Sequence, residues 1–422
     1  METITHYPHM MRQILYILTT AVALGAALPA DAAPRVITKE EQKAIRKYEK
    51  QKKAESKDKK KILKDIKKRA TVLKKELAHI TPIPMPTAKV AEDQVEALEQ
   101  AAKEGDAEAM VQLGHFYMSQ EKTPQVNKKK AGEYFHRAAE SGNADAVTWS
   151  AIYDFFMMEG KSDLEKQKAA RQKCCEAAKK VAAESCMAAY LAGLMSDDDA
   201  EKKQFYEQSA RAGFVPAMRA LGEIMLEEYA TDSAVKFARA PEDVAVWLEL
   251  AFKNGDMRAA MARSNSNYMH RSNSEEDTDT AEAEKWLRQA LPLALAREEH
   301  WFGHLFDSTQ PSPFTGAWGG ERMFGVLSVY GRLVRVKLFD SKNPADVLRE
   351  CCNTIKKMAE AGEPDAMAAA VLLPRKWSFW MGLKTTDPGI LNEKEWLAKL
   401  KEKANAGDPR AARALNECNK LK

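Results

Sequence analysis

The sequence predicts an all-α fold, a solenoid of antiparallel helix pairs, and three observations predict it. A small residue followed four positions later by alanine occurs seven times along the chain. Alanine stands three positions before that small residue in six of the seven cases. The motif returns at intervals of roughly 40 residues, a period typical of helical repeats. A chain of 422 residues with 45% hydrophobic and 30% charged side chains can hold several such units in a folded protein.

The first residues of the chain predict export. Residues 14–28 carry no charge, and the "PADAAP" that follows offers small residues at Ala30 and Ala32. This pattern is typical of a secretory signal peptide over residues 1–32, cleaved before Ala33. The apolar run is short for a bilayer span, so an uncleaved anchor is the less favoured interpretation. Translation begins at one of three methionines, Met1, Met10 or Met11.

A basic helical arm is predicted over residues 33–80. Between Arg35 and Ile80 there are 18 Lys and Arg against 7 Asp and Glu, a balance of +11. Because the whole chain carries +4 and residues 1–34 contribute −1, residues 81–422 carry −6. Apolar residues recur along the arm at the three- and four-residue spacing of one helix face. They are Leu63, Ile66, Ala70, Leu73, Leu77 and Ile80.

Two interpretations of this arm stay open. Its apolar stripe docks on the neighbouring repeats, or residues 35–80 contact anionic lipid or cell-wall polymer through their basic face. Nucleic acid ranks below both as a partner, because the chain is predicted to be exported. The "TPIPMP" within residues 81–89 is predicted to be a stiff, extended, Pro-rich linker.

Each of the seven motifs predicts a corner between two helices of the region 90–422. The small residue, usually glycine, ends one helix in the left-handed conformation, which glycine adopts without a Cβ penalty. Asp106, Asp256 and Asp408 are the predicted N-caps of the helices that follow. Pro364 and Pro409 fit the first turn of such helices. The motif pairs are Gly105 with Ala109, Gly142 with Ala146, Ser185 with Ala189, Gly213 with Ala217, Gly255 with Ala259, Gly362 with Ala366, and Gly407 with Ala411.

Two further glycines, Gly114 and Gly222, stand nine residues after a motif glycine, inside the predicted helices. A glycine costs about 1 kcal/mol relative to alanine in a helix interior. We therefore expect a partner helix to pack closely against the backbone at both positions. Close packing offsets the cost when it buries about 40 Å² of additional apolar surface.

The interval between Gly255 and Gly362 hides further, degenerate units. Ala283, Trp286 and Ala290 match the phase of an earlier helix, which places a degenerate corner at Ala294. One more helix pair is predicted over 321–339 and 344–362. The region 90–422 then holds about seven to eight units, degenerate between 263 and 345.

Three stretches of the repeat region resemble a known family. "AAKEGDAEAMVQLGHFY", "KKKAGEYFHRAAESGNADA" and "ARAGFVPAMRALGEIM" are similar to Sel1-like repeats, relatives of the tetratricopeptide repeat. The resemblance implies a right-handed α-solenoid that acts as an assembly scaffold or adaptor, without a common catalytic residue. Departures from the pattern are Ser185 in place of glycine, a short third unit, and insertions at 263–280, 307–320 and 374–391.

Six cysteines in a chain predicted to be exported raise the question of disulfides. They are Cys174, Cys175, Cys186, Cys351, Cys352 and Cys418. The two adjacent pairs fall at or next to a phase that holds a small buried alanine elsewhere, which favours core packing. A bridge from Cys175 to Cys186 is geometrically awkward, because the two lie about 13 to 15 Å apart along the helix. Their redox state stays open.

No constellation of catalytic, cofactor-binding or metal-binding residues stands out. "GKS" at 160–162 lacks the strand and the first glycine of a phosphate-binding loop. His300 and His304 are four residues apart, but Gly303 lies between them and the metalloprotease motif is absent. The acidic clusters at 196–199 and 274–280 lack the glycine and terminal glutamate of a calcium loop. They are interpreted as solvated loops that cap the following helices.

Partner binding is predicted for aromatic residues on insertions rich in Gly and Pro. Aromatic side chains on such loops anchor partners economically. The alternative is that they fold back and fill the solenoid where a repeat is imperfect. The candidates are Phe314, Trp318, Trp377, Phe379 and Trp380.

The sequence therefore favours an exported repeat scaffold that binds an unidentified protein or peptide, without enzymatic activity and without a cofactor. The first alternative is a structural protein of the cell envelope, held to wall polymer or anionic lipid by the basic arm. The second alternative is a hydrolase or metal-binding enzyme that uses His300.

Overall fold

The described part of the chain is helical. A computed structural model describes residues 46, 60–86, 90–119, 124–158, 163–231, 241–268, 280–296, 333, 344–381 and 393–420. No strand forms among these residues, and one isolated parallel bridge joins Ile83 to Phe214. The chain divides into two compact units, 1–61 and 62–422, and the second holds the helices described below.

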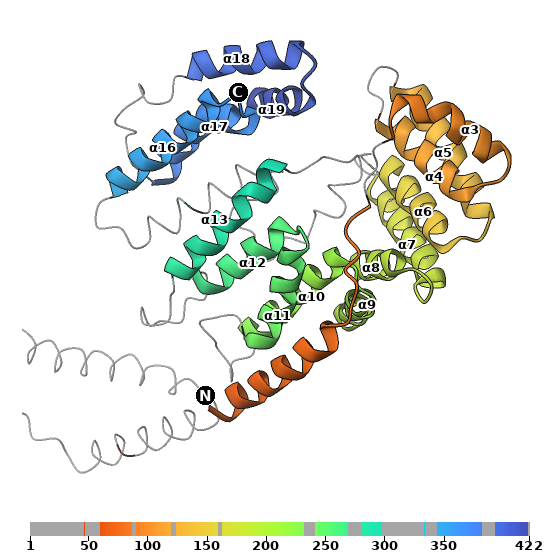
Figure 1. Cartoon of the computed structure of the whole chain (residues 1–422), viewed down its shortest axis with the longest axis horizontal. Coiled ribbons are helices and arrows are strands. Elements are labelled where there is room, and N and C mark those ends of the chain that lie inside the picture. The colour runs from red at the N-terminus through yellow and green to blue at the C-terminus, as the bar shows by residue number, and fades with distance from the viewer. Residues whose placement is uncertain are drawn as a thin grey trace, which may run out of the picture. The chain divides into compact units, whose positions relative to one another are not determined.

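The helices follow one another in antiparallel pairs (Figure 1), and each packs on the next along the chain wherever both are described. An unlabelled helix at 60–77 comes first, followed by a short 3-10 turn, η1, at Glu92–Gln94. The labelled helices are α3 (Val95–Lys103), α4 (Ala107–Ser119), α5 (Pro124–Glu140), α6 (Ala144–Met158), α7 (Leu164–Val181), α8 (Cys186–Met195), α9 (Asp199–Arg211), α10 (Val215–Thr231), α11 (Glu242–Lys253), α12 (Met257–Tyr268), α13 (Thr280–Ala296), α16 (Pro344–Glu360), α17 (Pro364–Met381), α18 (Glu393–Asn405) and α19 (Pro409–Lys420).

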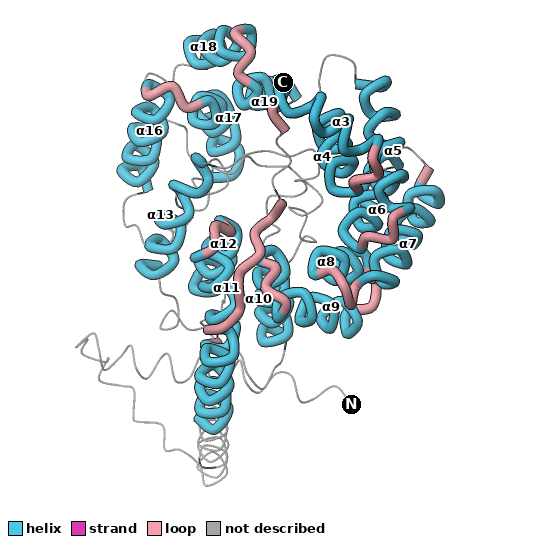
Figure 2. The backbone as a smooth tube through the Cα atoms, turned by 45° about the vertical axis from the view of Figure 1, so that its right-hand side comes forward, coloured by secondary structure: helices cyan, strands magenta, loops and turns pink. Residues whose placement is uncertain are grey.

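The predicted glycine corners are confirmed. Short loops join the two helices of a pair at these corners (Figure 2). All six motif glycines adopt positive φ, and no other described residue does. The angles are 97° at Gly105, 76° at Gly142, 102° at Gly213, 92° at Gly255, 91° at Gly362 and 91° at Gly407. The fold is therefore the all-α solenoid of helix pairs that the sequence predicts.

Side-chain caps close most of these corners, as predicted. Asp106 accepts hydrogen bonds from the backbone N–H of Glu108 and Ala109, at 2.8 and 3.1 Å. Asp256 and Asp408 do the same for α12 and α19. Helices α17 and α19 begin at Pro364 and Pro409, as their sequence indicates.

Ser185 departs from the prediction. It is the N-cap of α8, with φ −129°, and its hydroxyl accepts a hydrogen bond from the N–H of Ala188 at 3.0 Å. The motif position of this unit is therefore Glu184, one residue earlier. Gly193 then stands nine residues after the motif, as Gly114 and Gly222 do in their units. The register chosen from Ser185 and Ala189 was wrong because a capping serine was mistaken for the corner residue.

The interior glycines lie where a neighbouring helix packs closely. A Cβ atom at Gly114 would lie 2.6 Å from the ring of Phe135, and one at Gly222 would lie 2.6 Å from Leu248. At Gly193 the obstructing group is the ring of Tyr206 at 2.7 Å. The predicted close approach is confirmed, and the group that fills the space is a large side chain of the next helix.

Helices that follow a corner also contact each other across the repeats. Contacts of this kind join α4 to α6, α6 to α8, α10 to α12 and α17 to α19. Helix α8 is buried at every position from Met187 to Met195. These helices therefore form the inner row of the array, which explains their small residues.

Two details of the degenerate region differ from the prediction. Helix α13 continues to Ala296, so no corner forms at Ala294. Helix α12 extends to Tyr268, so the first part of the predicted insertion at 263–280 is helical. Helix α16 follows the predicted helix at 344–362 closely. Of the predicted helix at 321–339, only Leu333 belongs to the described residues, where it is helical and buried.

A buried ionic network ties α10 to α12. The side chain of Arg219 is 2% exposed, and it donates to Asp256 at 3.0 Å and to Glu223 at 2.9 Å. Arg258 is the second cation, and burial, with Arg219 nearby, lowers its pKa to about 10. Burial also raises the pKa of Glu223. Two cations thus balance two carboxylates beside Tyr190.

Gly114→Ala is expected to lower stability by about 1 to 3 kcal/mol despite the higher helix propensity of alanine, because the added methyl group displaces the ring of Phe135. Thermal unfolding of the purified chain measures the effect. The double variant Gly114→Ala/Phe135→Leu should recover part of the loss, and an unchanged melting temperature in Gly114→Ala alone would contradict the packing argument.

Arg219→Ala is expected to cost about 3 to 5 kcal/mol, because it leaves two carboxylates in a buried site with less compensating charge. Lys203→Ala is the control, since the ion pair of Lys203 with Glu228 is 37% and 50% exposed and such pairs contribute about 1 kcal/mol or less. Urea unfolding of both variants measures the loss in free energy of unfolding. Equal losses would show that the buried network does not stabilise the fold more than an exposed ion pair does.

Candidate functional site: the acceptor surface for residues 60–86

The first described helix docks on the repeats. Ile66, Ala70 and Leu77, spaced four and seven residues apart on one face, are 0%, 4% and 5% exposed. Ala70 and Leu77 belong to the apolar core that also contains residues of α8 to α12, and Ile66 packs with Tyr229 of α10. Of the two interpretations of the basic arm, docking of its apolar stripe is therefore observed for 60–77. We call the face of the repeats that receives this helix, together with the corner at Gly213, the acceptor surface.

A buried carboxylate recognises this helix. Asp243, in the first turn of α11, has a side chain that is 5% exposed. It accepts a hydrogen bond from Arg69 Nε at 3.2 Å and another from the Tyr229 hydroxyl at 2.9 Å, while Arg69 Nη2 donates to Tyr229 at 2.8 Å. Burial, together with Asp243, raises the pKa of Tyr229 to about 12, so the phenol stays a donor to the carboxylate.

Two further ion pairs lie at the edge of this contact. Arg211 of α9 pairs with Glu76 at 3.1 Å, and Lys67 pairs with Glu242 at 3.7 Å. All four side chains are between 45% and 69% exposed. Exposed pairs of this kind contribute little free energy. Burial of the apolar face and the Arg69–Asp243 contact therefore carry most of the docking.

The Pro-rich segment continues the contact along the backbone. Ile83 N–H donates to the carbonyl of Gly213 at 2.8 Å, and Val215 N–H donates to the carbonyl of Ile83 at 3.0 Å. Because Pro82 and Pro84 lack N–H groups, Ile83 is the one backbone donor of this tripeptide. Residues before proline favour extended backbone. The segment is therefore shaped for this pairing and, over 81–86, lies against the repeats.

The paired corner is the one that lacks a polar capping side chain. The residue after the motif glycine is Asp or Asn at four other corners, but here it is Phe214, which is 1% exposed. The first N–H groups of a helix need an acceptor. The carbonyl of Ile83 supplies one to Val215, the first residue of α10. A residue from the N-terminal segment thus caps a helix of the fourth corner.

Gly213 accommodates the segment because it has no side chain. A Cβ atom at Gly213 would overlap the carbonyl oxygen of Thr81, whereas one at Gly255, in the same left-handed conformation, would meet nothing within 4 Å. Gly213 is therefore required both for its φ of 102° and for the space it leaves.

The opposite face of helix 60–77 is basic and exposed. Seven of its lysines are exposed to solvent, alongside the acidic residues Asp65 and Glu76. They are Lys60, Lys61, Lys64, Lys67, Lys68, Lys74 and Lys75. Docking therefore hides the apolar stripe and leaves a cationic surface.

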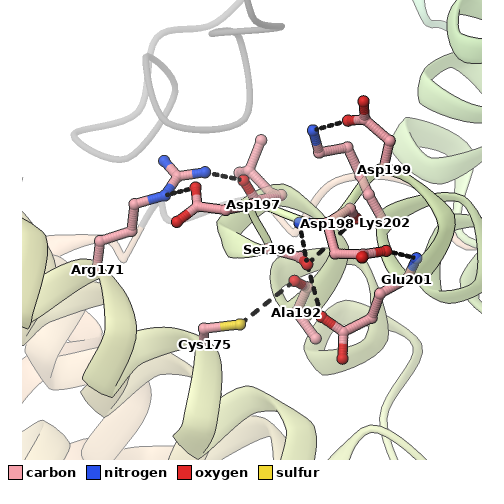
Figure 3. A network of polar contacts seen from close by, with 10 residues as sticks. Arg171, Cys175, Ala192, Ser196, Asp197, Asp198, Asp199, Glu201 and Lys202 are labelled. Carbon is pink, nitrogen blue, oxygen red and sulfur yellow. Dashed lines mark hydrogen bonds and ion pairs between the residues drawn. The ribbon is translucent and has the colours of Figure 1, made fainter.

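The acidic cluster at 196–199 forms a helix cap, as interpreted from the sequence (Figure 3). Asp198 is the N-cap of α9 and accepts from Glu201 N–H at 2.8 Å. The hydroxyl of Ser196 donates to Glu201 at 2.6 Å, and Lys202 pairs with Asp199 at 3.0 Å. These carboxylates are engaged by neighbouring donors. The cluster at 274–280 lies outside the described residues except for Thr280.

Helix α7 contacts the turn between α8 and α9, which holds this cluster, through Arg171 and Cys175 (Figure 3). Arg171 donates to the carbonyl of Leu194 at 2.8 Å and pairs with Asp197 at 3.5 Å. The thiol of Cys175 lies 3.7 Å from the carbonyl of Ala192 and donates to it. These contacts hold the turn between α8 and α9 against α7.

The cysteine side chains that the structure describes are buried or partly buried. They are Cys174, Cys175, Cys186, Cys352 and Cys418. Burial raises the pKa of Cys174 to about 12 and that of Cys352 to about 11. These two thiols are therefore protonated and unreactive at neutral pH, in agreement with the core-packing interpretation.

The predicted insertion at 374–391 begins later than the sequence indicates. Trp377, Phe379 and Trp380 belong to helix α17 rather than to a loop, because α17 continues to Met381. Phe314 and Trp318 lie outside the described residues, as do His300, His304 and the apolar segment 14–28.

Two searches of the described residues were negative. No group of three or more His, Cys, Asp or Glu side chains there is arranged to hold a metal ion. Among the same residues, no helix has the length and apolar character that a membrane crossing requires.

Sequence reasoning missed the acceptor residues. Asp243 and Tyr229 look like ordinary positions of an acidic first turn and an amphipathic helix, and they lie 174 and 160 residues from Arg69. One signal was available. Phe214 occupies the capping position of its corner, where an aspartate or asparagine would be expected.

No protein-family model matches the chain. No curated protein matches it. Two solved structures are similar to it. One is a Sel1 repeat protein from Oxalobacter formigenes, with 20% identity, a TM-score of 0.34, and coverage of 47% of this chain and 78% of the other. The second is a protective antigen of uropathogenic Escherichia coli that displays an SLR fold, with 15% identity, a TM-score of 0.23, and coverage of 79% and 91%.

Both descriptions name the repeat type that the sequence motifs of this chain resemble. At these TM-scores the superpositions carry no argument by themselves. The class of the fold rests on the helix pairs, the six left-handed glycines and the interior glycines of this chain.

Gly213→Ala is expected to release the N-terminal segment, because its methyl group overlaps the carbonyl of Thr81. Gly255→Ala is the matched control, since it carries the same left-handed penalty of about 1 to 2 kcal/mol without an obstructing group. Limited trypsin digestion, followed by mass spectrometry, measures cleavage within the lysine-rich helix 60–77. Cleavage there should be faster in Gly213→Ala, and equal rates in the two variants would refute the steric argument.

Proposed function

We propose that this protein is an exported, non-enzymatic repeat scaffold that binds other proteins. The acceptor surface is the observation that carries this proposal. It holds an amphipathic helix through an apolar face and an arginine, and an extended segment through backbone hydrogen bonds. Helix-in-groove contact and backbone pairing are two general modes by which proteins recognise peptides. The repeats of this chain use both on a segment of their own chain.

Export is supported by the sequence at the start of the chain. The uncharged run at 14–28 and the small residues before Ala33 fit a cleaved signal peptide. We place the mature protein in the periplasm or outside the cell. A partner there is an unidentified protein or peptide, and nucleic acid is not expected in that compartment.

A second candidate function follows from the exposed lysines of helix 60–77. With the apolar stripe docked, this basic face is presented to solvent and is suited to anionic lipid or wall polymer. In this alternative the protein is a structural component of the cell envelope, and the repeats hold the basic helix in place. A hydrolase or metal-binding enzyme that uses His300 is the second alternative, and His300 lies outside the described residues.

Capture by cross-linking from the source envelope distinguishes the first two functions. The bait is the chain from Ala33 onward, and the matched variant carries Lys64→Ser, Lys68→Ser and Lys75→Ser, none of which touches the docked face. For a protein-binding scaffold, both baits should retain the same defined proteins by mass spectrometry. Retention that depends on the three lysines would refute binding by the repeats.

Sedimentation with vesicles tests the envelope alternative directly. Vesicles containing anionic phosphatidylglycerol should bind the wild-type chain at low salt and release it as ionic strength rises, because exposed charges are screened within about 10 Å at 0.1 M salt. The triple lysine variant should bind several-fold less. Binding that is equal in both proteins, or insensitive to salt, would exclude the basic face as the contact.

A further inference from the structure

The acceptor surface contains groups that need an occupant. Without residues 60–86, the carbonyl of Gly213 and the N–H of Val215 lose their partners, and Asp243 loses its guanidinium. Tyr229 and the backbone N–H of Val244 would remain on Asp243, both as neutral donors. Buried polar groups left without partners are costly. The surface is therefore built to be covered, by its own segment or by another.

The resident segment is held by few strong contacts. Its helix buries three apolar side chains, those of Ile66, Ala70 and Leu77. The side chains of its peripheral ion pairs are about half exposed. Val72 and Ile83 remain 48% and 41% exposed. Its connection to α3 is short, since only eight residues separate Ile83 from the start of η1 at Glu92. A short tether supplies a high effective concentration without additional contacts. Occupation by the tethered segment therefore does not require high intrinsic affinity.

The geometry points to a displaceable peptide-binding site. We propose that the acceptor surface binds a segment of a partner protein, and that residues 60–86 occupy this site until such a segment replaces them. The partner segment is a basic amphipathic helix with an arginine on the edge of its apolar face, followed by an extended apolar residue whose N–H and carbonyl are free to pair. This deepens the proposed scaffold function by naming its site and the chemistry of its ligand.

Charge and shape together favour this class of ligand. The acceptor side contributes Asp243 and Glu242 beside Tyr229, and residues 81–422 carry −6 overall. An arginine satisfies Asp243 and Tyr229 at once because its guanidinium offers several donors in one plane. At the corner, Gly213 leaves room for a backbone carbonyl that a Cβ atom would obstruct. An acidic or purely apolar segment would leave Asp243 uncompensated.

The test uses the full mature chain with its own arm disabled by Ile66→Asp and Leu77→Asp. The probe is a fluorescent synthetic peptide with the sequence of residues 60–86, and anisotropy measures its binding. The disabled chain should bind the peptide saturably and at least about tenfold more tightly than the wild-type chain, where the tethered segment competes. Adding Gly213→Ala to the disabled chain should reduce binding about tenfold, while adding Gly255→Ala should not.

Specificity is read from two control peptides. A peptide with Arg69→Ala should bind about tenfold more weakly, and a scrambled peptide of the same composition should not saturate. Equal binding of the scrambled peptide, or of the disabled and wild-type chains, would overturn the proposal. So would concentration-dependent dimers of the wild-type chain that vanish in both the disabled chain and the Gly213→Ala chain, because they would name a second copy as the occupant.

These outcomes are separate from those of the scaffold proposal. If the peptide fails to bind but the envelope capture retains defined proteins, the scaffold function stands and its site lies elsewhere on the repeats. If the peptide binds but capture retains nothing, the acceptor surface serves the arm alone, and both the scaffold function and the displacement by a foreign partner are refuted.

Discussion

At every corner of the array, the chain must end one helix, reverse direction and satisfy the first N–H groups of the next helix. Glycine solves the first part by adopting a left-handed conformation, and a neighbouring aspartate, asparagine or serine solves the second. The corner at Gly213 is different, because Phe214 has no polar side chain to offer and the carbonyl of Ile83 pairs with Val215 instead. The N-terminal segment thus meets a requirement of this corner in addition to burying its apolar face.

Close packing between helices occurs where a helix that follows a corner meets the next helix along the chain, as α4 meets α5 and α8 meets α9. A glycine at the contact lets a large ring of the next helix meet the helix backbone. Gly114 against Phe135 and Gly193 against Tyr206 show the result. The array gains buried apolar surface at the cost of local helix propensity. Charged groups that enter this core are paired, as in the balanced network around Arg219, which joins one repeat to the next.

Docking of the arm turns a basic amphipathic helix into two surfaces with different uses. Its apolar stripe, with Arg69, is directed at Tyr229 and Asp243, and its lysines remain in solvent. The exposed lysines suit an anionic polymer, and the covered acceptor surface suits a peptide of the arm's own character. The two proposed functions thus use opposite faces of one helix, so substitutions on one face leave the other intact.

The sequence by itself determined the repeat architecture, because its signals are local. A left-handed glycine, a capping aspartate and an apolar stripe each act within a few residues, so Gly105, Asp106 and Leu77 could be interpreted correctly without coordinates. A local signal also misled where one residue type has two uses, as with Ser185. The tertiary structure alone decided where the arm docks and which residues receive it. Arg69 and Asp243 are 174 residues apart, and nothing local marks them as partners. Their contact arises only when the helix at 60–77 packs on the folded repeats, because no interaction within either segment brings the two side chains together.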